Sequence, residues 1–143
     1  MNETAHLKPA LIIDDNDDYA SMLLAHFEPH GFQFTRAHDA HEGLEVLQRS
    51  GTNAYKAIIT DITMGSQTAG LKLIRRIRKH GYRGVLIVAS TGFDSPFILQ
   101  VAKPVMNMLG ADILIPKRPL KAGQLRCHPI TMRGKFWEAT YLT

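Results

Sequence analysis

The sequence predicts an α/β protein in which a parallel sheet is covered by helices on both faces. Five short apolar runs alternate along the chain with longer segments whose apolar residues recur three and four positions apart. This order is typical of parallel strands joined by helices. Four of the five runs also end on polar residues that can carry chemistry. The carboxyl ends of parallel strands share one edge of a sheet, where ligands bind, so the sequence predicts a site at that edge.

The first three predicted elements are a strand, a helix and an outer strand. The strand is the apolar run 10–13, which stops at Asp14 and Asp15. The helix that follows has acidic residues in its first turn, an end at Pro29, and one apolar face made of Ala20, Leu23, Leu24 and Phe27. Residues 32–37 alternate between apolar and polar side chains, as expected of an outer strand.

A second helix and the central strand come next. Asp39 and Glu42 have the spacing of a capping box, which predicts a helix that ends before Gly51. The apolar run 57–60 then stops abruptly at Asp61. A buried strand that ends on a carboxylate presents that group at the sheet edge rather than in the core.

The third helix is predicted to open at Gly70 and to end at Gly81. Its apolar face consists of Leu71, Ile74 and Ile77, and its basic residues mostly face water. Residues 85–89 predict a fourth strand, which leads into Ser90 and Thr91.

The last predicted helix and strand carry two further signals. Ser95 followed by Pro96 is typical of a helix start. Pro104 interrupts the helical pattern, so we expect a kinked or divided helix there. The fifth strand is the run 112–115, which leads toward Lys117.

Composition bounds the class of protein. The chain has 143 residues, 45% hydrophobic and 21% charged, which fits one globular domain. The longest apolar run is too short to span a bilayer and no secretory signal is visible, so we expect a cytoplasmic protein without a membrane partner. The single Cys127 excludes an internal disulfide. The net charge of +4 is modest, and the Arg-rich stretch 75–83 is interpreted as a solvated face first, a docking face for an acidic partner second, and a nucleic-acid contact third.

Three carboxylates are predicted to converge at the carboxyl edge of the sheet. Asp14, Asp15 and Asp61 would repel one another unless a cation or a proton lies between them. Magnesium prefers oxygen ligands and keeps several waters, so two carboxylates and a backbone carbonyl form a plausible part of its shell. The pattern therefore favours a Mg²⁺ site.

The same edge offers groups suited to phosphoryl transfer. A carboxylate beside magnesium can act as a nucleophile toward phosphorus when the metal and a lysine neutralise the charge on the transferring oxygens. Lys117 is placed to supply that ammonium group. The hydroxyl of Ser90 or of Thr91 could donate a hydrogen bond to a phosphoryl oxygen.

Four ordered motifs carry a resemblance to a known family. These are "LIIDDND", "IITDITM", "IVASTGF" and "GADILIPKRP", and in this order the chain resembles the receiver domain of bacterial two-component response regulators from about Ala10 to Pro119. The resemblance implies a flavodoxin-like (βα)5 fold with a doubly wound, five-stranded parallel sheet in strand order 2-1-3-4-5. It also implies a receiver core at residues 1–119, with 120–143 as an atypical C-terminal segment of the same domain.

The resemblance assigns roles to individual residues. Asp61 would accept a phosphoryl group from a histidine kinase or a phosphotransfer protein, and Lys117 would contact that group. Asp14 and Asp15 would bind Mg²⁺ together with Asp61 and the backbone carbonyl of Thr63. Thr91 is slightly favoured as the switch hydroxyl because a small residue and an aromatic follow it, whereas Ser90 lies closer to the end of the apolar run.

Two functional hypotheses follow, and a third is disfavoured. The first is a signalling switch rather than an enzyme, with autocatalytic phosphoryl transfer, slow self-dephosphorylation and an unidentified downstream protein target. The alternative is a pseudo-receiver that works through protein contacts without phosphorylation, which Gly65 in place of the usual proline and Leu114 in place of the usual aromatic both favour. A phospho-aspartate hydrolase would need a second acid where Thr63 stands.

The C-terminal part departs most from the family pattern. Arg118 separates Lys117 from Pro119, which leaves a cis Arg118–Pro119 bond as an option. Residues 120–143 contain three helix breakers and no sustained three-four spacing, so we expect the fifth helix to be atypical or missing. The aromatic side chains of this segment need a place to bury. Exchange between the protomers of a homodimer or packing on an exposed sheet face would provide one.

Overall fold

The computed structural model describes residues 7–62 and 67–142. Its centre is a sheet in the order β2-β1-β3-β4-β5-β6, which confirms the expected order of the first five strands. These five pair in parallel, and β6 is an unpredicted addition that runs antiparallel to β5. The strands are β1 (Lys8–Ile13), β2 (Phe32–Ala37), β3 (Ala57–Asp61), β4 (Val85–Ser90), β5 (Ile113–Pro116) and β6 (His128–Pro129).

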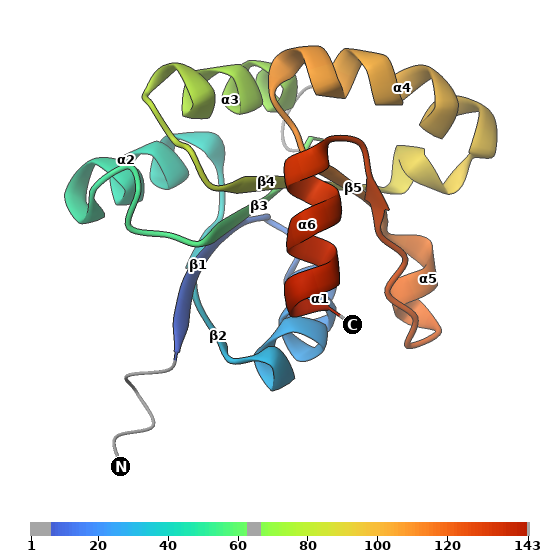
Figure 1. Cartoon of the computed structure of the whole chain (residues 1–143), viewed down its shortest axis with the longest axis horizontal. Coiled ribbons are helices and arrows are strands. Elements are labelled where there is room, and N and C mark those ends of the chain that lie inside the picture. Colours follow the sequence, from blue (N-terminus) through green and yellow to red (C-terminus); the bar gives the residue numbers. More distant parts are fainter. Residues whose placement is uncertain (1–6, 63–66, 143) are drawn as a thin grey trace.

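Helices cover both faces of the sheet (Figure 1). One face carries α2 (Ala40–Ser50), α3 (Gln67–Lys79) and α4 (Pro96–Leu109), and the other carries α1 (Asp17–Phe27), α5 (Arg118–Lys121) and α6 (Met132–Tyr141). Two short 3₁₀ helices, η2 (Glu28–His30) and η3 (Thr91–Asp94), follow α1 and β4. No helix among the described residues is long and apolar enough to cross a bilayer.

The inner strands β1, β3, β4 and β5 contain continuous apolar runs because both of their faces are buried, whereas the outer strand β2 alternates between more and less buried residues. In β4, Leu86 and Val88 join the core under α2, α3 and α4, whereas Val85, Ile87 and Ala89 join the core under α1, α5 and α6. Every residue of β4 is buried. A parallel sheet with helices on both sides needs this pattern, and it is the reason the sequence predicts the strands well.

Helix caps form where the sequence predicts them. The Asp39 side chain accepts a hydrogen bond from the Glu42 amide (2.8 Å), and Glu42 Oε2 in turn accepts from the His38 amide (3.1 Å). In the usual capping box the glutamate accepts from the amide of the N-cap residue, here Asp39. In this protein Glu42 accepts instead from the amide of the preceding residue, His38. At the start of α4, Ser95 Oγ accepts from the Ile98 amide at 3.4 Å, with Pro96 at the first helical position.

The structure corrects two local predictions and decides a third point that the sequence leaves open. First, α3 begins at Gln67 rather than at Gly70. A Cβ atom on Gly70 would overlap the backbone of Ile62, so glycine lets the helix approach the end of β3 instead of opening the helix. Second, the expected division of the helix at Pro104 is wrong, since α4 continues through that residue, while a kink there stays a prediction. Third, the Arg118–Pro119 bond is trans, and the described residues contain no cis peptide bond.

The C-terminal segment contains a helix that the sequence does not predict. After the single turn of α5, β6 pairs with β5, and α6 then packs beside α1 (Figure 1). Trp137 is 7% exposed, with its ring centroid 5.5 Å from that of Phe32 and 5.5 Å from that of Tyr141. Packing on the sheet face therefore accommodates these aromatics within one chain, although Phe136 is 72% exposed. The fifth helix is atypical, as expected.

The weak helical pattern of α6 has a physical reason. Only Gly134 and Trp137 are buried among its residues. A Cβ atom on Gly134 would overlap the carbonyl oxygen of Asp112, so the helix touches the start of β5 through backbone rather than through an apolar side chain. One large ring on one side of a short helix gives no repeating apolar signal.

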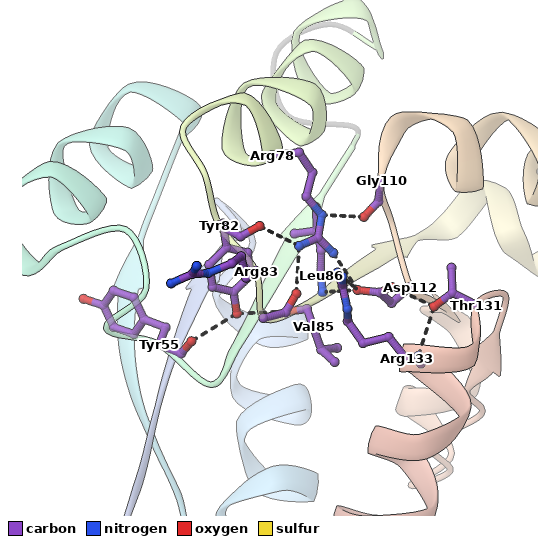
Figure 2. Close-up of polar contacts among 12 residues, drawn as sticks. Tyr55, Arg78, Tyr82, Arg83, Val85, Leu86, Gly110, Asp112, Thr131 and Arg133 are labelled. Carbon is purple, nitrogen blue, oxygen red and sulfur yellow. Dashed lines mark hydrogen bonds and ion pairs between the residues drawn. The ribbon is translucent and has the colours of Figure 1, made fainter.

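A polar network joins α3, the sheet and the C-terminal segment at the end of the sheet opposite the predicted site (Figure 2). Arg78 donates to Asp112 Oδ2 at 2.6 Å and to the carbonyl oxygens of Gly110 (2.8 Å), Tyr82 (2.9 Å) and Gly84 (2.8 Å). Asp112 also accepts from the Leu86 amide at 3.0 Å and, through Oδ1, from the Thr131 hydroxyl at 2.7 Å. Burial lowers the pKa of Arg78, and the negative charge of Asp112 opposes that shift.

Candidate functional site

Three charged side chains meet where β1, β3 and β5 end. Asp14 directly follows β1, Asp61 is the last residue of β3, and Lys117 directly follows β5. Lys117 Nζ lies 2.8 Å from Asp61 Oδ2 and 2.8 Å from Asp14 Oδ2. All three residues are buried, with exposed fractions of 1% for Asp14, 3% for Asp61 and 2% for Lys117. The fold therefore brings together groups that lie far apart in the sequence.

The acidic cluster includes Asp15 as its exposed member. One carboxylate oxygen from each of Asp14, Asp15 and Asp61 lies within 4.8 Å of the others. Asp14 Oδ1 accepts a hydrogen bond from the Asn16 amide at 2.9 Å. Asp14 Oδ2 is buried and, apart from its ion pair with Lys117, has no partner in hydrogen-bonding geometry within the described part of the chain.

The residues present fit a hard divalent cation. The buried Oδ2 of Asp14, whose one contact within the described residues is the ion pair with Lys117, and the carboxylates of Asp15 and Asp61 form an all-oxygen donor set, which is the kind that Mg²⁺ prefers. The cluster also carries one ammonium group against three carboxylates, so a cation would reduce its net negative charge. The predicted carbonyl ligand of Thr63, like Gly65, lies outside the described residues.

Burial raises the pKa of Asp14. Desolvation of the carboxylate is the largest cause, and it outweighs the opposing attraction of Lys117 and the hydrogen bond from the Asn16 amide. The folded protein therefore holds a proton on Asp14 more tightly than the unfolded chain does. Its contribution to stability is present below the ordinary pKa of 3.8 and is lost as the pH rises through the raised pKa.

Replacing Asp14 with asparagine is therefore expected to stabilise the protein at neutral pH when no divalent cation is present. The expected increase in Tm is on the order of a few degrees, and it should disappear at a pH below about 3.8 because Asp14 is then neutral in both states. Melting curves with EDTA across this pH range measure the effect. A lower Tm for Asp14→Asn at neutral pH would contradict it. Added Mg²⁺ should raise the Tm of the wild type more than that of the variant.

Two residues that the sequence analysis missed support this site. Arg36 on β2 donates to the backbone oxygen of Asp14 through Nε (3.2 Å) and Nη2 (2.9 Å), and it forms an ion pair with Asp17 at 2.6 Å. The ring of Tyr19 lies under Lys117, with Nζ 4.9 Å from its centroid. Arg36 stands on the same side of β2 as Phe32 and Phe34, where the alternation leads one to expect an apolar residue, and only the pairing of β2 with β1 shows its role.

The two candidate hydroxyls occupy different environments. Ser90 ends β4 with 1% of its surface exposed, and its Oγ accepts from the Gly92 amide at 3.0 Å. Thr91 is exposed and begins η3. The chain near them is held to the end of β5, because Asp94 Oδ1 accepts from the Arg118 amide at 3.0 Å and the Lys117 amide donates to the Ser90 carbonyl at 3.2 Å. Both hydroxyls stay candidates for the switch group.

Comparisons with known proteins agree with this fold. The model of the response regulator receiver domain family matches residues 10–126. The transcriptional regulatory protein CpxR homolog of Haemophilus influenzae is 29% identical over 107 residues, which cover 75% of this chain and 42% of that protein. The chain thus spans less than half the length of this relative.

Solved structures show the same fold. The receiver domain of a Francisella response regulator has a TM-score of 0.64 at 24% identity, covering 93% of this chain and 98% of that one. The response regulator TrrA from Thermotoga maritima, solved in complex with Mg²⁺-BeF, has a TM-score of 0.52 at 24% identity, covering 59% of this chain and 70% of that one. With a family model that matches most of its length, the chain belongs to the response regulator receiver domains of two-component systems.

Proposed function

We propose that the protein is a phosphorylatable signalling switch in which Asp61 accepts a phosphoryl group. One observation supports this most: Lys117 bridges Asp61 and Asp14 at 2.8 Å from each, inside a buried cluster that fits Mg²⁺. Receiver domains interact with histidine kinases or phosphotransfer proteins and with downstream targets. For this chain, the donor would be a phosphohistidine on such a partner.

The residues of the site suit that reaction. A carboxylate oxygen of Asp61 attacks phosphorus, the P–N bond to histidine breaks, and the bonding electrons leave with the imidazole nitrogen. Lys117 Nζ, 2.8 Å from Asp61 Oδ2, compensates the charge on the transferring oxygens. The hydroxyl of Ser90 or Thr91 then donates to a phosphoryl oxygen. Asp14, Asp15 and Asp61, with the Thr63 carbonyl, would hold Mg²⁺, which supplies electrostatic stabilisation of the phosphoryl oxygens when bound, as the Mg²⁺-BeF complex of TrrA suggests.

The proposal includes the extent of the domain and its output. Residues 1–119 form the receiver core, and 120–143 belong to the same domain because α6 contributes Trp137 to the core under α1. The protein acts by changing conformation for a partner rather than by turning over a substrate, and slow hydrolysis of the aspartyl phosphate resets it.

Intact mass spectrometry tests the proposal. Incubation with acetyl phosphate and Mg²⁺ should add one phosphoryl group to the wild type, none to Asp61→Asn, and none when EDTA replaces Mg²⁺. Asp39→Asn is the matched control, since Asp39 caps α2 and is not a member of the acidic cluster, so this variant should keep the adduct. A wild type without an adduct under any donor or metal condition would overturn the switch. That result would favour the pseudo-receiver, with which the buried aliphatic Leu114 agrees.

A further inference from the structure

Exposed apolar side chains are concentrated on α4. Within the described residues, this helix presents five large ones to solvent: Phe97 (77% exposed), Ile98 (48%), Val101 (53%), Val105 (44%) and Met108 (81%). Leu99 and Met106 are the buried contacts of the same helix with the core. An apolar surface of this extent on one helix indicates an interaction site rather than scattered surface residues.

Three of these exposed apolar residues, Ile98, Val101 and Val105, line a groove beside α4. The cavity between α3 and α4 has a volume of about 500 Å³. Leu71 of α3 forms one wall, Ile98, Val101 and Val105 of α4 form the other, and Ile62 and Phe93 contribute to its lining. The two helices lie next to each other on the same face of the sheet (Figure 1). A groove of this kind accepts the apolar face of a helix.

The two helices that flank the groove carry charges of one sign. Together, α3 and α4 contain six basic residues and no acidic residue, more positive charge than the +4 of the whole chain. Arg75 lies one helical turn beyond Leu71 and therefore on the groove side of α3. Arg75 and three other basic residues of α3 are exposed and have no ion pair within the described residues: Lys72, Arg76 and Lys79.

We infer that the groove between α3 and α4 binds an amphipathic helix of a partner protein, with apolar side chains in the groove and acidic side chains facing α3. Charge complementarity favours this partner, because its acidic side chains would face the basic residues of α3. A second copy of the chain would bring the basic residues of two α3 helices together, and a flat bilayer would leave the groove between the helices unfilled. This inference goes beyond the proposed function, because it requires no phosphoryl group on Asp61.

A labelled synthetic helix tests the inference by fluorescence anisotropy. The probe carries leucine at spacings of three and four residues, so that the leucines share one face of the helix, and glutamate at the other positions. The matched probe carries lysine in place of glutamate. We expect the acidic probe to bind the wild type about tenfold more tightly than the basic probe. Val101→Glu and the double variant Arg75→Glu/Arg76→Glu should each weaken binding of the acidic probe by about tenfold or more. These side chains are exposed, so the variants should keep the wild-type Tm.

Phe136→Glu is the control, because it makes the same kind of change at an exposed apolar residue on the opposite face of the sheet. It should bind the acidic probe as the wild type does. Equal binding of both probes, or binding of the acidic probe that Val101→Glu leaves unchanged, overturns the inference. So does self-association in sedimentation equilibrium that Val101→Glu abolishes, since the occupant is then a second copy. Binding to vesicles of anionic lipid without binding to the acidic probe overturns it as well.

Discussion

Replacing Lys117 with methionine is expected to lower the free energy of unfolding by about 3–5 kcal/mol when no divalent cation is present. Lys117 lies 2.8 Å from a carboxylate oxygen of both Asp14 and Asp61, and all three residues are buried. Methionine keeps the apolar stem but removes the charge, so two adjacent buried carboxylates lose the ammonium group between them. Urea denaturation in EDTA at neutral pH measures the loss.

The same variant should respond more strongly to Mg²⁺ than the wild type does. A divalent cation placed among the three carboxylates supplies the positive charge that methionine has removed. The increase in Tm on adding Mg²⁺ should therefore be larger for Lys117→Met than for the wild type. Lys121→Met is the matched control, because Lys121 is exposed and has no ion pair with the acidic cluster. Equal Mg²⁺ responses in Lys117→Met and the wild type would count against a cation site at this cluster.

The second large effect is expected for Asp112→Ala, at the opposite end of the sheet. Removing the carboxylate leaves Arg78 without its buried anion and deprives the Leu86 amide and the Thr131 hydroxyl of an acceptor (Figure 2). We expect a loss of about 3–5 kcal/mol in the free energy of unfolding, measured by urea denaturation. The tertiary contacts of α6 should weaken most, because Thr131 caps this helix.

Two further variants separate the charge pair from general damage. Arg133→Ala is the control, since Arg133 is half exposed and lies 3.7 Å from Asp112 Oδ2, and it should cost no more than about 1 kcal/mol. The double variant Arg78→Met/Asp112→Leu should be more stable than Asp112→Ala, because it leaves no unpaired buried charge. If Asp112→Ala and Arg133→Ala unfold at the same urea concentration, the network does not stabilise the fold as described.

The sheet and the acidic site could be predicted because their signals lie within short segments. Each strand buried on both faces is a continuous apolar run, and the polar residue that ends it marks the shared edge of the sheet. Asp14, Asp61 and Lys117 were predictable for this reason, and the structure places them in contact.

The elements that could not be predicted depend on contacts between distant segments. The helix α6 is fixed by a backbone contact at Gly134 and by two rings, Trp137 against α1 and β2 and Tyr141 against β2. Arg36 and Asp112 are single polar residues inside ordinary strand patterns, and only their partners on other elements reveal what they hold. Gly70 does not mark the start of α3, because this glycine allows a close approach to Ile62.

The position of α6 has a consequence for how the domain is made. Trp137 fills the core between Phe27 and Phe32, which belong to the first third of the chain. During synthesis, Phe27 and Phe32 are made before Trp137, which they contact in the folded domain. The apolar layer under α6 therefore stays uncovered until translation has passed residue 137. A version of the domain trimmed at residue 126, where the family match stops, would leave that layer uncovered and prone to aggregate.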